Sequence, residues 1–347
     1  MRETTGPAEA LTRTTREGWD RFAQPCPTPA RVTRRQYTAW TSARKQAYDD
    51  ARLLYHSQFI VAETPLVSET MTQVELLLRL NRAEHGARRG LLVTGPSGTG
   101  KTTAVTTAAL RYYHAERRLH PETVPVVYIT VPPAAGAKSV SAEFAHFLGY
   151  PIPRRVNRFE LTFAVAELLA ELGTQLIVVD EIHNINLSNK LGGECADQLK
   201  YFAERLPATM CYAGLETVLP SLFTGARGAQ LAGRFTHVRS DPYGYATPQE
   251  RQRWAELVAA FDHALILLRH EPGALVNMSD YLYRRSAGIV GALTHLVRSA
   301  AIQAIVSHHE HIQQHDLDHI QINIAAEEAF TTPTARSRRP KRRHART

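Results

Sequence analysis

Residues 95 to 102 constrain this 347-residue chain more than any other segment, because they match the pattern GxxxxGK[ST] in full. In order, they are Gly95, Pro96, Ser97, Gly98, Thr99, Gly100, Lys101 and Thr102. An apolar run at 91–93 precedes them, and helix-compatible residues starting at Thr103 follow. A strand, a glycine-rich loop and a helix in this order direct backbone N–H groups and the positive end of the helix toward one anion. The segment therefore predicts a nucleoside triphosphate site formed by residues 95–103. Lys101 is expected to reach the β- and γ-phosphates, and the Thr102 hydroxyl to bind Mg²⁺.

An acidic motif downstream supplies the second half of such a site. The apolar run at 176–179 ends in Asp180 and Glu181. A run that is apolar at every position is typical of a strand buried on both faces. At the carboxyl end of that strand, Asp180 is expected to hold Mg²⁺ or its water shell. Glu181 is expected to orient or deprotonate an attacking water. The two motifs together predict an ATPase with ATP and Mg²⁺ as its ligands, and with Lys101 and Glu181 as catalytic residues.

Predicted strands and helices alternate over the middle of the chain. Strands are expected at 90–94, 124–131, 176–179 and 209–213. Helices are expected at 69–85, from the phosphate loop to about 113, and at 140–149, 158–173 and 195–205. This alternation specifies an α/β fold, a parallel sheet covered by helices on both faces. Both motifs then fall at the carboxyl ends of strands, where such sheets bind ligands.

The pattern changes to helices only after residue 245. Residues 247–250 read Thr-Pro-Gln-Glu, a capping box with proline at the first helical position, and a second helix is expected at 289–306. We therefore predict four parts. They are a polar and basic extension at 1–60, a nucleotide-binding αβα domain at 61–245, a small helical lid domain at 246–330 and a disordered basic tail at 331–347.

The net charge of +8 is concentrated in the tail. Seven cations and no acid follow residue 331: Arg336, Arg338, Arg339, Lys341, Arg342, Arg343 and Arg346. Such a tail suits sequence-independent contacts with the phosphates of double-stranded DNA, although a merely solubilising end remains an alternative. The sequence lacks an apolar stretch of membrane-spanning length and a signal-peptide core, and its three cysteines form no disulfide or metal pattern. A cytoplasmic protein without membrane association is expected.

Several short strings resemble a known family. They are Gly90 to Thr94 leading into the phosphate loop, Val179 to Asn184, Asp197 to Lys200 with Glu204 to Pro207, Gln230 to Phe235, and Ser286 to Gly291. Over roughly residues 58–325 the chain resembles the TniB/TnsC-type transposition ATPases, the AAA+ partners of DDE-type transposases. The resemblance implies an AAA+ fold and ATP-dependent assembly of a homo-oligomer, as a ring or filament, on DNA. It further implies that the assembly recruits or activates a DDE-type transposase and takes part in target selection.

The same resemblance assigns Arg234 as an arginine finger, a guanidinium supplied to the γ-phosphate of a neighbouring subunit. Arg227 and Arg239 compete for that role. Two departures from the AAA+ pattern predict slow hydrolysis. The strand at 209–213 lacks an Asn or Thr at its tip for sensor 1, and Arg298 comes one turn late for the usual lid arginine.

Other interpretations of the sequence stay open. One is a nucleotide-dependent oligomeric scaffold with little turnover. Another is a different DNA-acting P-loop ATPase, related to initiators and helicase loaders or to defence ATPases. The four-residue spacing of His311, His315 and His319 suggests a metal site, but the required carboxylate or cysteine partners are missing, so we do not adopt it. His183 is expected to pack or cap beside the active site and not to act as a base.

Overall fold

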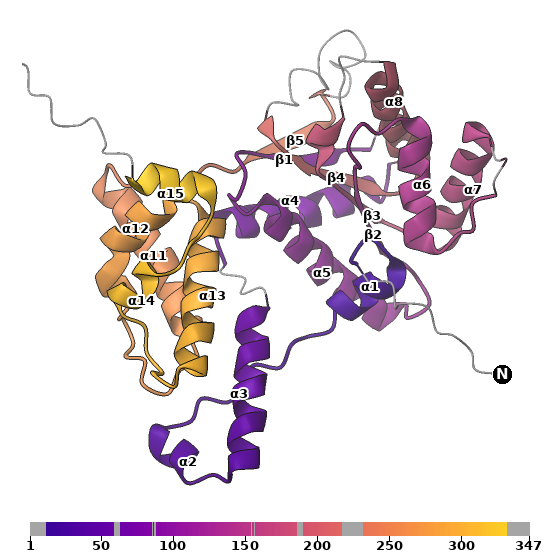
Figure 1. Cartoon of the computed structure of the whole chain (residues 1–347). Coiled ribbons are helices and arrows are strands. Elements are labelled where there is room, and N and C mark those ends of the chain that lie inside the picture. The colour runs from indigo at the N-terminus through magenta and orange to yellow at the C-terminus, as the bar shows by residue number, and fades with distance from the viewer. Residues whose placement is uncertain are drawn as a thin grey trace, which may run out of the picture. The chain divides into compact units, whose positions relative to one another are not determined.

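The computed structural model describes residues 12–58, 63–84, 86, 88–153, 155, 157–185, 190–216 and 232–331. The chain divides into two compact units (Figure 1). Unit 1 comprises Met1–Thr28 and Val61–Asp241, and unit 2 comprises Pro29–Ile60 and Pro242–Thr347. The segment expected as one extension over 1–60 is thus shared between the two units. The predicted basic tail, apart from Thr331, lies outside the described residues.

A five-stranded parallel sheet forms the centre of unit 1. Its strands are β1 (Gly90–Thr94), β2 (Val126–Thr130), β3 (Leu176–Asp180), β4 (Thr209–Gly214) and β5 (Phe235–Arg239), in the order β2-β3-β4-β1-β5. Strands β1, β3 and β4 are buried at every position, and β2 is buried at all but its last residue. Because all the pairings are parallel, the carboxyl ends of β1 and β3 lie on the same edge of the sheet. The predicted α/β fold is confirmed.

Strand β5 is an element that the sequence analysis missed. It pairs with β1 at the edge of the sheet, in register from Gly90 opposite Phe235 to Thr94 opposite Arg239. Only Val238 of its five residues is buried. An exposed edge strand lacks the continuous apolar run that marks the inner strands, so its sequence gives little signal.

The helices of unit 1 pack in two groups. The helices of this unit are α1 (Arg16–Phe22), α4 (Pro65–Asn81), α5 (Lys101–Leu119), α6 (Ala137–Leu148), α7 (Arg158–Glu171) and α8 (Lys190–Arg205). Helix α4 packs on α5, and α6 packs on both α7 and α8. Thr64 caps α4 by accepting a hydrogen bond from Val67 N, so this helix begins four residues before the predicted start.

Helix α1 is fixed to unit 1 by aromatic contacts. The Trp19 ring is buried and stacks on Tyr128 of β2, with ring centroids 5.7 Å apart. The Tyr113 hydroxyl donates to Asp20 Oδ1 at 2.7 Å. The N-terminal segment around residue 19 is therefore part of the core of unit 1.

Unit 2 contains helices and no strand among its described residues. The helices are α2 (Arg34–Thr38), α3 (Ser42–Ser57), α11 (Pro248–Ala264), α12 (Ser279–Ser286), α13 (Val290–Val306), α14 (Gln314–Asp318) and α15 (Ile324–Thr331). The capping box at the start of α11 is present, with Glu250 N donating to Thr247 Oγ1 and Thr247 N donating to Glu250 Oε2.

Helix α3 packs against α13 and carries a buried arginine. The guanidinium of Arg52 donates to both carboxylate oxygens of Glu310, at 2.7 and 2.8 Å, and to Asp49 Oδ1 at 2.6 Å. One turn further along, His56 Nε2 accepts a hydrogen bond from Ile266 N at 3.3 Å. These contacts make residues 29–58 part of the helical unit. Across the described parts of both units, every helix is too short or too polar to cross a bilayer.

Candidate nucleotide-binding site

The phosphate loop between β1 and α5 depends on three glycines. Gly95, Gly98 and Gly100 have φ values of +152°, +77° and +97°, a region that residues with a side chain rarely adopt. A Cβ atom on Gly95 would lie 1.9 Å from the carbonyl oxygen of Ser240. Gly100 is the N-cap of α5 and, having no side chain, leaves the first turn without a side-chain cap. The N–H groups at this helix end are therefore available to an external anion.

Side-chain hydroxyls hold the loop in this conformation. Thr99 Oγ1 donates to the Pro96 carbonyl at 2.9 Å, and Ser240 Oγ donates to the Thr99 carbonyl at 3.1 Å. The Ser240 N–H donates to the Thr94 carbonyl at 2.7 Å. Sequence reasoning missed Ser240, because the only signal for it is its position directly after β5, a strand that was not predicted.

The Lys101 side chain folds back over the loop. Its Nζ donates to the Pro96 carbonyl at 2.6 Å. Burial lowers the pKa of Lys101, while the nearby carboxylates Glu181 and Asp180 act in the opposite direction. Phosphate oxygens of a bound nucleotide can take the place of the Pro96 carbonyl as acceptors for this half-buried ammonium group.

Asp180 joins the two sequence motifs. Thr102 Oγ1 donates to Asp180 Oδ2 at 2.8 Å, across 78 residues of sequence. Tyr128 Oη donates to the same oxygen at 2.7 Å, and the Glu181 N–H donates to Oδ1 at 2.8 Å. Burial raises the pKa of Tyr128, so its hydroxyl remains a neutral donor. Thr102 and Asp180 thus lie side by side as the spacing of the motifs predicts, and a hydroxyl next to a carboxylate fits the oxygen ligands that Mg²⁺ prefers.

Glu181 begins a short 3-10 turn, η1 (Ile182–Asn184), with an unusual backbone conformation. Its φ is +56°, which is strained for a residue with a side chain. Its side chain is 44% exposed, and Oε2 lies 3.1 Å from Nδ1 of His183. The Glu181 carboxylate is thus accessible, and His183 lies beside it.

Arg234 lies far from the phosphate loop of its own chain. Its carbonyl accepts a hydrogen bond from Gly90 N at 3.0 Å, at the start of β1, whereas the loop follows the end of β1. Five residues of strand separate these points, about 16 Å at 3.3 Å per residue. The guanidinium is within 3.5 Å of Glu204 of α8. Any contact between this guanidinium and a γ-phosphate must therefore involve another subunit.

Arg239 and Arg227 are the alternatives to Arg234 as an arginine finger. Arg239 lies at the loop end of β5, opposite Thr94, and forms ion pairs with Glu216 at 3.3 Å and Asp241 at 3.0 Å. Arg227 lies outside the described residues. The structure therefore brings together the residues of the two motifs, whereas Arg234 lies at the other end of β1 and Arg239 pairs with Glu216 and Asp241.

The end of β4 has no room for a sensor side chain. A Cβ on Gly214 would lie 2.6 Å from Ile182 Cγ2 and 3.2 Å from His183 N. In unit 2, the guanidinium of Arg298 donates to the carbonyls of His56 and Ser57, the first at 2.9 Å. Gly214 and Arg298 are thus each engaged in contacts within their own unit.

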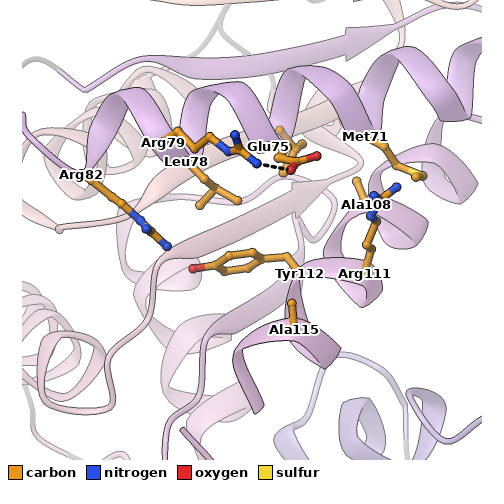
Figure 2. A pocket seen from close by; sticks show the side chains of 10 residues that line it. Met71, Glu75, Leu78, Arg79, Arg82, Ala108, Arg111, Tyr112 and Ala115 are labelled. Carbon is orange, nitrogen blue, oxygen red and sulfur yellow. Dashed lines mark hydrogen bonds and ion pairs between the residues drawn. The ribbon is translucent and has the colours of Figure 1, made fainter. Parts of the chain in front are cut away.

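Two further features bear on the choice of site, a metal-ligand cluster and a cavity. No cluster of three or more His, Cys, Asp or Glu side chains that could hold a metal occurs among the described residues. A cavity of about 200 Å³ lies between α4 and α5 and is lined in part by Arg79, Arg111 and Tyr112, which Figure 2 draws. None of the predicted site residues lines this cavity.

The family model described as Bacterial TniB protein matches residues 54–245, more than half of the chain. The chain belongs to the TniB family. The matched segment contains the phosphate loop, Asp180, Glu181 and Arg234. No curated protein sequence matches this TniB-family chain significantly.

Solved structures with a similar fold include ORC and Cdc6p proteins. The Aeropyrum pernix ORC2 protein, in ADPNP and ADP complexes, aligns with a TM-score of 0.58 at 17% identity, over 81% of this chain and 72% of that chain. The Aeropyrum pernix ORC1 protein in complex with DNA gives 0.57 at 14% identity, over 78% and 65%. Cdc6p from Pyrobaculum aerophilum gives 0.52 at 21% identity, over 76% and 68%. The likeness identifies the fold of the TniB-family chain as that of AAA+ P-loop ATPases.

Proposed function

We propose that this TniB-family protein is a DNA-associated AAA+ ATPase that assembles in the presence of ATP and recruits or activates a DDE-type transposase. The hydrogen bond from Thr102 Oγ1 to Asp180 Oδ2, at 2.8 Å, is the observation that carries the proposal. It joins the phosphate loop to the acidic motif across 78 residues of sequence. The family match supports a role in transposition.

In this proposal, each residue of the site has a separate role. The N–H groups of residues 97–103 and the ammonium of Lys101 bind the phosphates. Thr102 and Asp180 hold Mg²⁺, which when bound neutralises charge on the β- and γ-phosphates. Glu181 activates the attacking water, and its strained turn and exposure are consistent with that role.

Contact with double-stranded DNA is supported by two independent observations. The chain has a net charge of +8, with seven cations in the last twelve residues. A protein of similar fold, the Aeropyrum pernix ORC1 protein, was solved in complex with DNA. An initiator-like function for this chain is less well supported, because identities of 14–21% extend only to the fold.

One observation favours a second candidate, a nucleotide-dependent scaffold with little turnover. The tight contact of Gly214 with Ile182 leaves no space for a sensor side chain at the end of β4. An assembly of this kind would bind ATP and DNA but release phosphate slowly. The two candidates share the nucleotide site and differ only in hydrolysis.

The decisive variant is Glu181→Gln, with Glu171→Gln on the exposed side of α7 as its control. Phosphate release by the full chain is measured with and without duplex DNA. The proposal expects turnover that rises with DNA, a loss of at least about 100-fold in Glu181→Gln, and no change in the control. Glu181→Gln should also retain ATP and accumulate as DNA-bound rings or filaments in electron micrographs.

Other outcomes of this experiment are equally informative. ATP-dependent assembly of the wild type without phosphate release would favour the scaffold. Equal turnover in both variants would remove Glu181 from the mechanism. Failure of a DDE-type transposase from the same genetic neighbourhood to join the ATP-bound assembly would contradict the recruitment role.

A further inference from the structure

Residues 30–48 of unit 2 carry five cations and no carboxylate. Arg34 and Arg35 lie on α2, and Arg44 and Lys45 lie in the first turns of α3. These four residues are called the α2–α3 basic patch. The fifth cation, Arg31, is already engaged, since its guanidinium donates to the carbonyls of Leu265 and His263.

An aromatic cluster fixes the shape of this helical hairpin. The ring centroids of Tyr37 and Trp40 are 5.9 Å apart, and those of Trp40 and Tyr48 are 5.2 Å apart. The Arg44 guanidinium lies over the Trp40 ring, 4.2 Å from its centroid, and Lys45 Nζ lies 5.6 Å from the Tyr37 centroid. Stacking orients the face of a guanidinium but leaves its N–H edges open to a ligand.

The positive charge of the patch is not balanced within the described chain. None of its four cations has a carboxylate within ion-pair distance among the described residues. The nearest acid in sequence, Asp49, already accepts from Arg52 at 2.6 Å and from the Tyr37 hydroxyl at 2.6 Å. Arg44 and Lys45 also lie near the N-terminus of α3, where the helix dipole disfavours cations. A bound polyanion would relieve both conflicts.

We propose that the α2–α3 basic patch contacts the sugar-phosphate backbone of duplex DNA. This inference rests on the proposed DNA association and gives it a surface outside the basic tail. The hydroxyls of Thr38, Thr41 and Ser42 lie among the cations in sequence and are the other side-chain type that commonly contacts phosphates. The contacts are sequence-independent, because they involve only the backbone of the duplex.

The composition of the patch favours a nucleic acid over an acidic protein. The core of a protein interface needs exposed apolar side chains, and no large hydrophobic residue in 30–48 is among the exposed ones of the described chain. The duplex is favoured over a single strand because the three aromatic rings contact one another and the cations, and so are not presented as separate platforms for bases.

The test uses the full chain, a fluorescent DNA duplex of arbitrary sequence, and a series of salt concentrations. The variants are Arg34→Gln with Arg35→Gln, and Arg44→Gln with Lys45→Gln. Each double variant should weaken DNA binding and reduce the slope of log K against log salt by about 1 to 2, since each phosphate contact contributes about 0.9. ATP binding, measured on the same preparations, should be unchanged.

Two control variants accompany these measurements. Arg253→Gln with Arg284→Gln removes two exposed cations from α11 and α12 and should leave the slope unchanged. Arg34→Lys with Arg35→Lys keeps the charge and should preserve most of the binding.

Three results would overturn the inference. An unchanged salt slope in both patch variants, with the wild type binding DNA, would remove the patch but leave the proposed function intact. Loss of transposase binding with normal DNA binding would make the patch a protein surface. No DNA binding by the wild type, with or without ATP, would contradict the proposed function as well.

Discussion

At the scale of single residues, Asp180 connects most of the described site. It accepts hydrogen bonds from Thr102, Tyr128 and the Glu181 N–H within 2.8 Å. Sequence alone predicted two of these neighbours, because Thr102 and Glu181 belong to recognisable motifs. Tyr128 could not be found in that way, because it reaches Asp180 from the neighbouring strand and no local pattern records strand pairing. Ser240 was missed for the same reason.

A single substitution, Gly95→Ala, tests the described conformation of the phosphate loop. Gly95→Ala would place a Cβ 1.9 Å from the Ser240 carbonyl in a backbone conformation that alanine rarely adopts. We expect it to destabilise the chain by about 1–3 kcal/mol and to abolish ATP binding. The control is Gly193→Ala, on α8, where a Cβ meets nothing within 4 Å. Helix propensity should make that change neutral or stabilising. Chemical denaturation of both variants checks the pair, and equal stability would contradict the described packing of the loop.

At the scale of elements, the positions of helices and strands were predicted best where neighbouring residues alone determine them. The strands β1 and β3 show continuous apolar runs, and α11 shows a capping box, so their positions follow from neighbouring residues. Helix α3 lies within the segment that was predicted only as an extension, and its packing was not predicted. The Arg52 to Glu310 ion pair spans 258 residues, and no local sequence signal reports a partner at that distance.

Burial of His56 on α3 makes the packing of this helix sensitive to pH. Burial lowers its pKa to about 4, from 6.5, and the cations Arg52, Arg298 and Arg31 act in the same direction. The unfolded chain therefore binds a proton below pH 6.5 that the folded chain does not bind until about pH 4. The contribution of His56 to stability should be constant above pH 6.5 and fall by about 3 kcal/mol toward pH 4.

Hydrogen exchange of α3 amides at several pH values measures this effect. Protection should decrease, after correction for intrinsic rates, as the pH falls from 6.5 to 4. A His56→Gln variant should lose most of this dependence, whereas His309→Gln, which changes an exposed histidine, should keep it. A pH-independent protection of α3 in the unmodified chain would show that His56 does not titrate as described.

At the scale of the whole molecule, the proposed role of Arg234 would make assembly part of the chemistry. Residue 234 lies at the opposite end of β1 from the phosphate loop, so under the proposed function its guanidinium would act on the nucleotide of another copy. In an assembly of this kind, Arg234→Ala should lower turnover by about 10³-fold while the ATP affinity stays nearly unchanged. Phosphate release and nucleotide binding, measured on the same preparation, check this. Equal turnover would leave Arg234 with only its ion pair to Glu204.

The account depends most directly on Mg²⁺ and ATP meeting at Thr102 and Asp180. Titration calorimetry of the full chain with ATP, in the presence and absence of Mg²⁺, measures this. We expect binding by the wild type that is strengthened by Mg²⁺, loss of the Mg²⁺ effect in Thr102→Ala, and wild-type behaviour in Thr72→Ala, which removes an exposed hydroxyl from α4. No heat of ATP binding by the wild type, or an undiminished Mg²⁺ effect in Thr102→Ala, would contradict it.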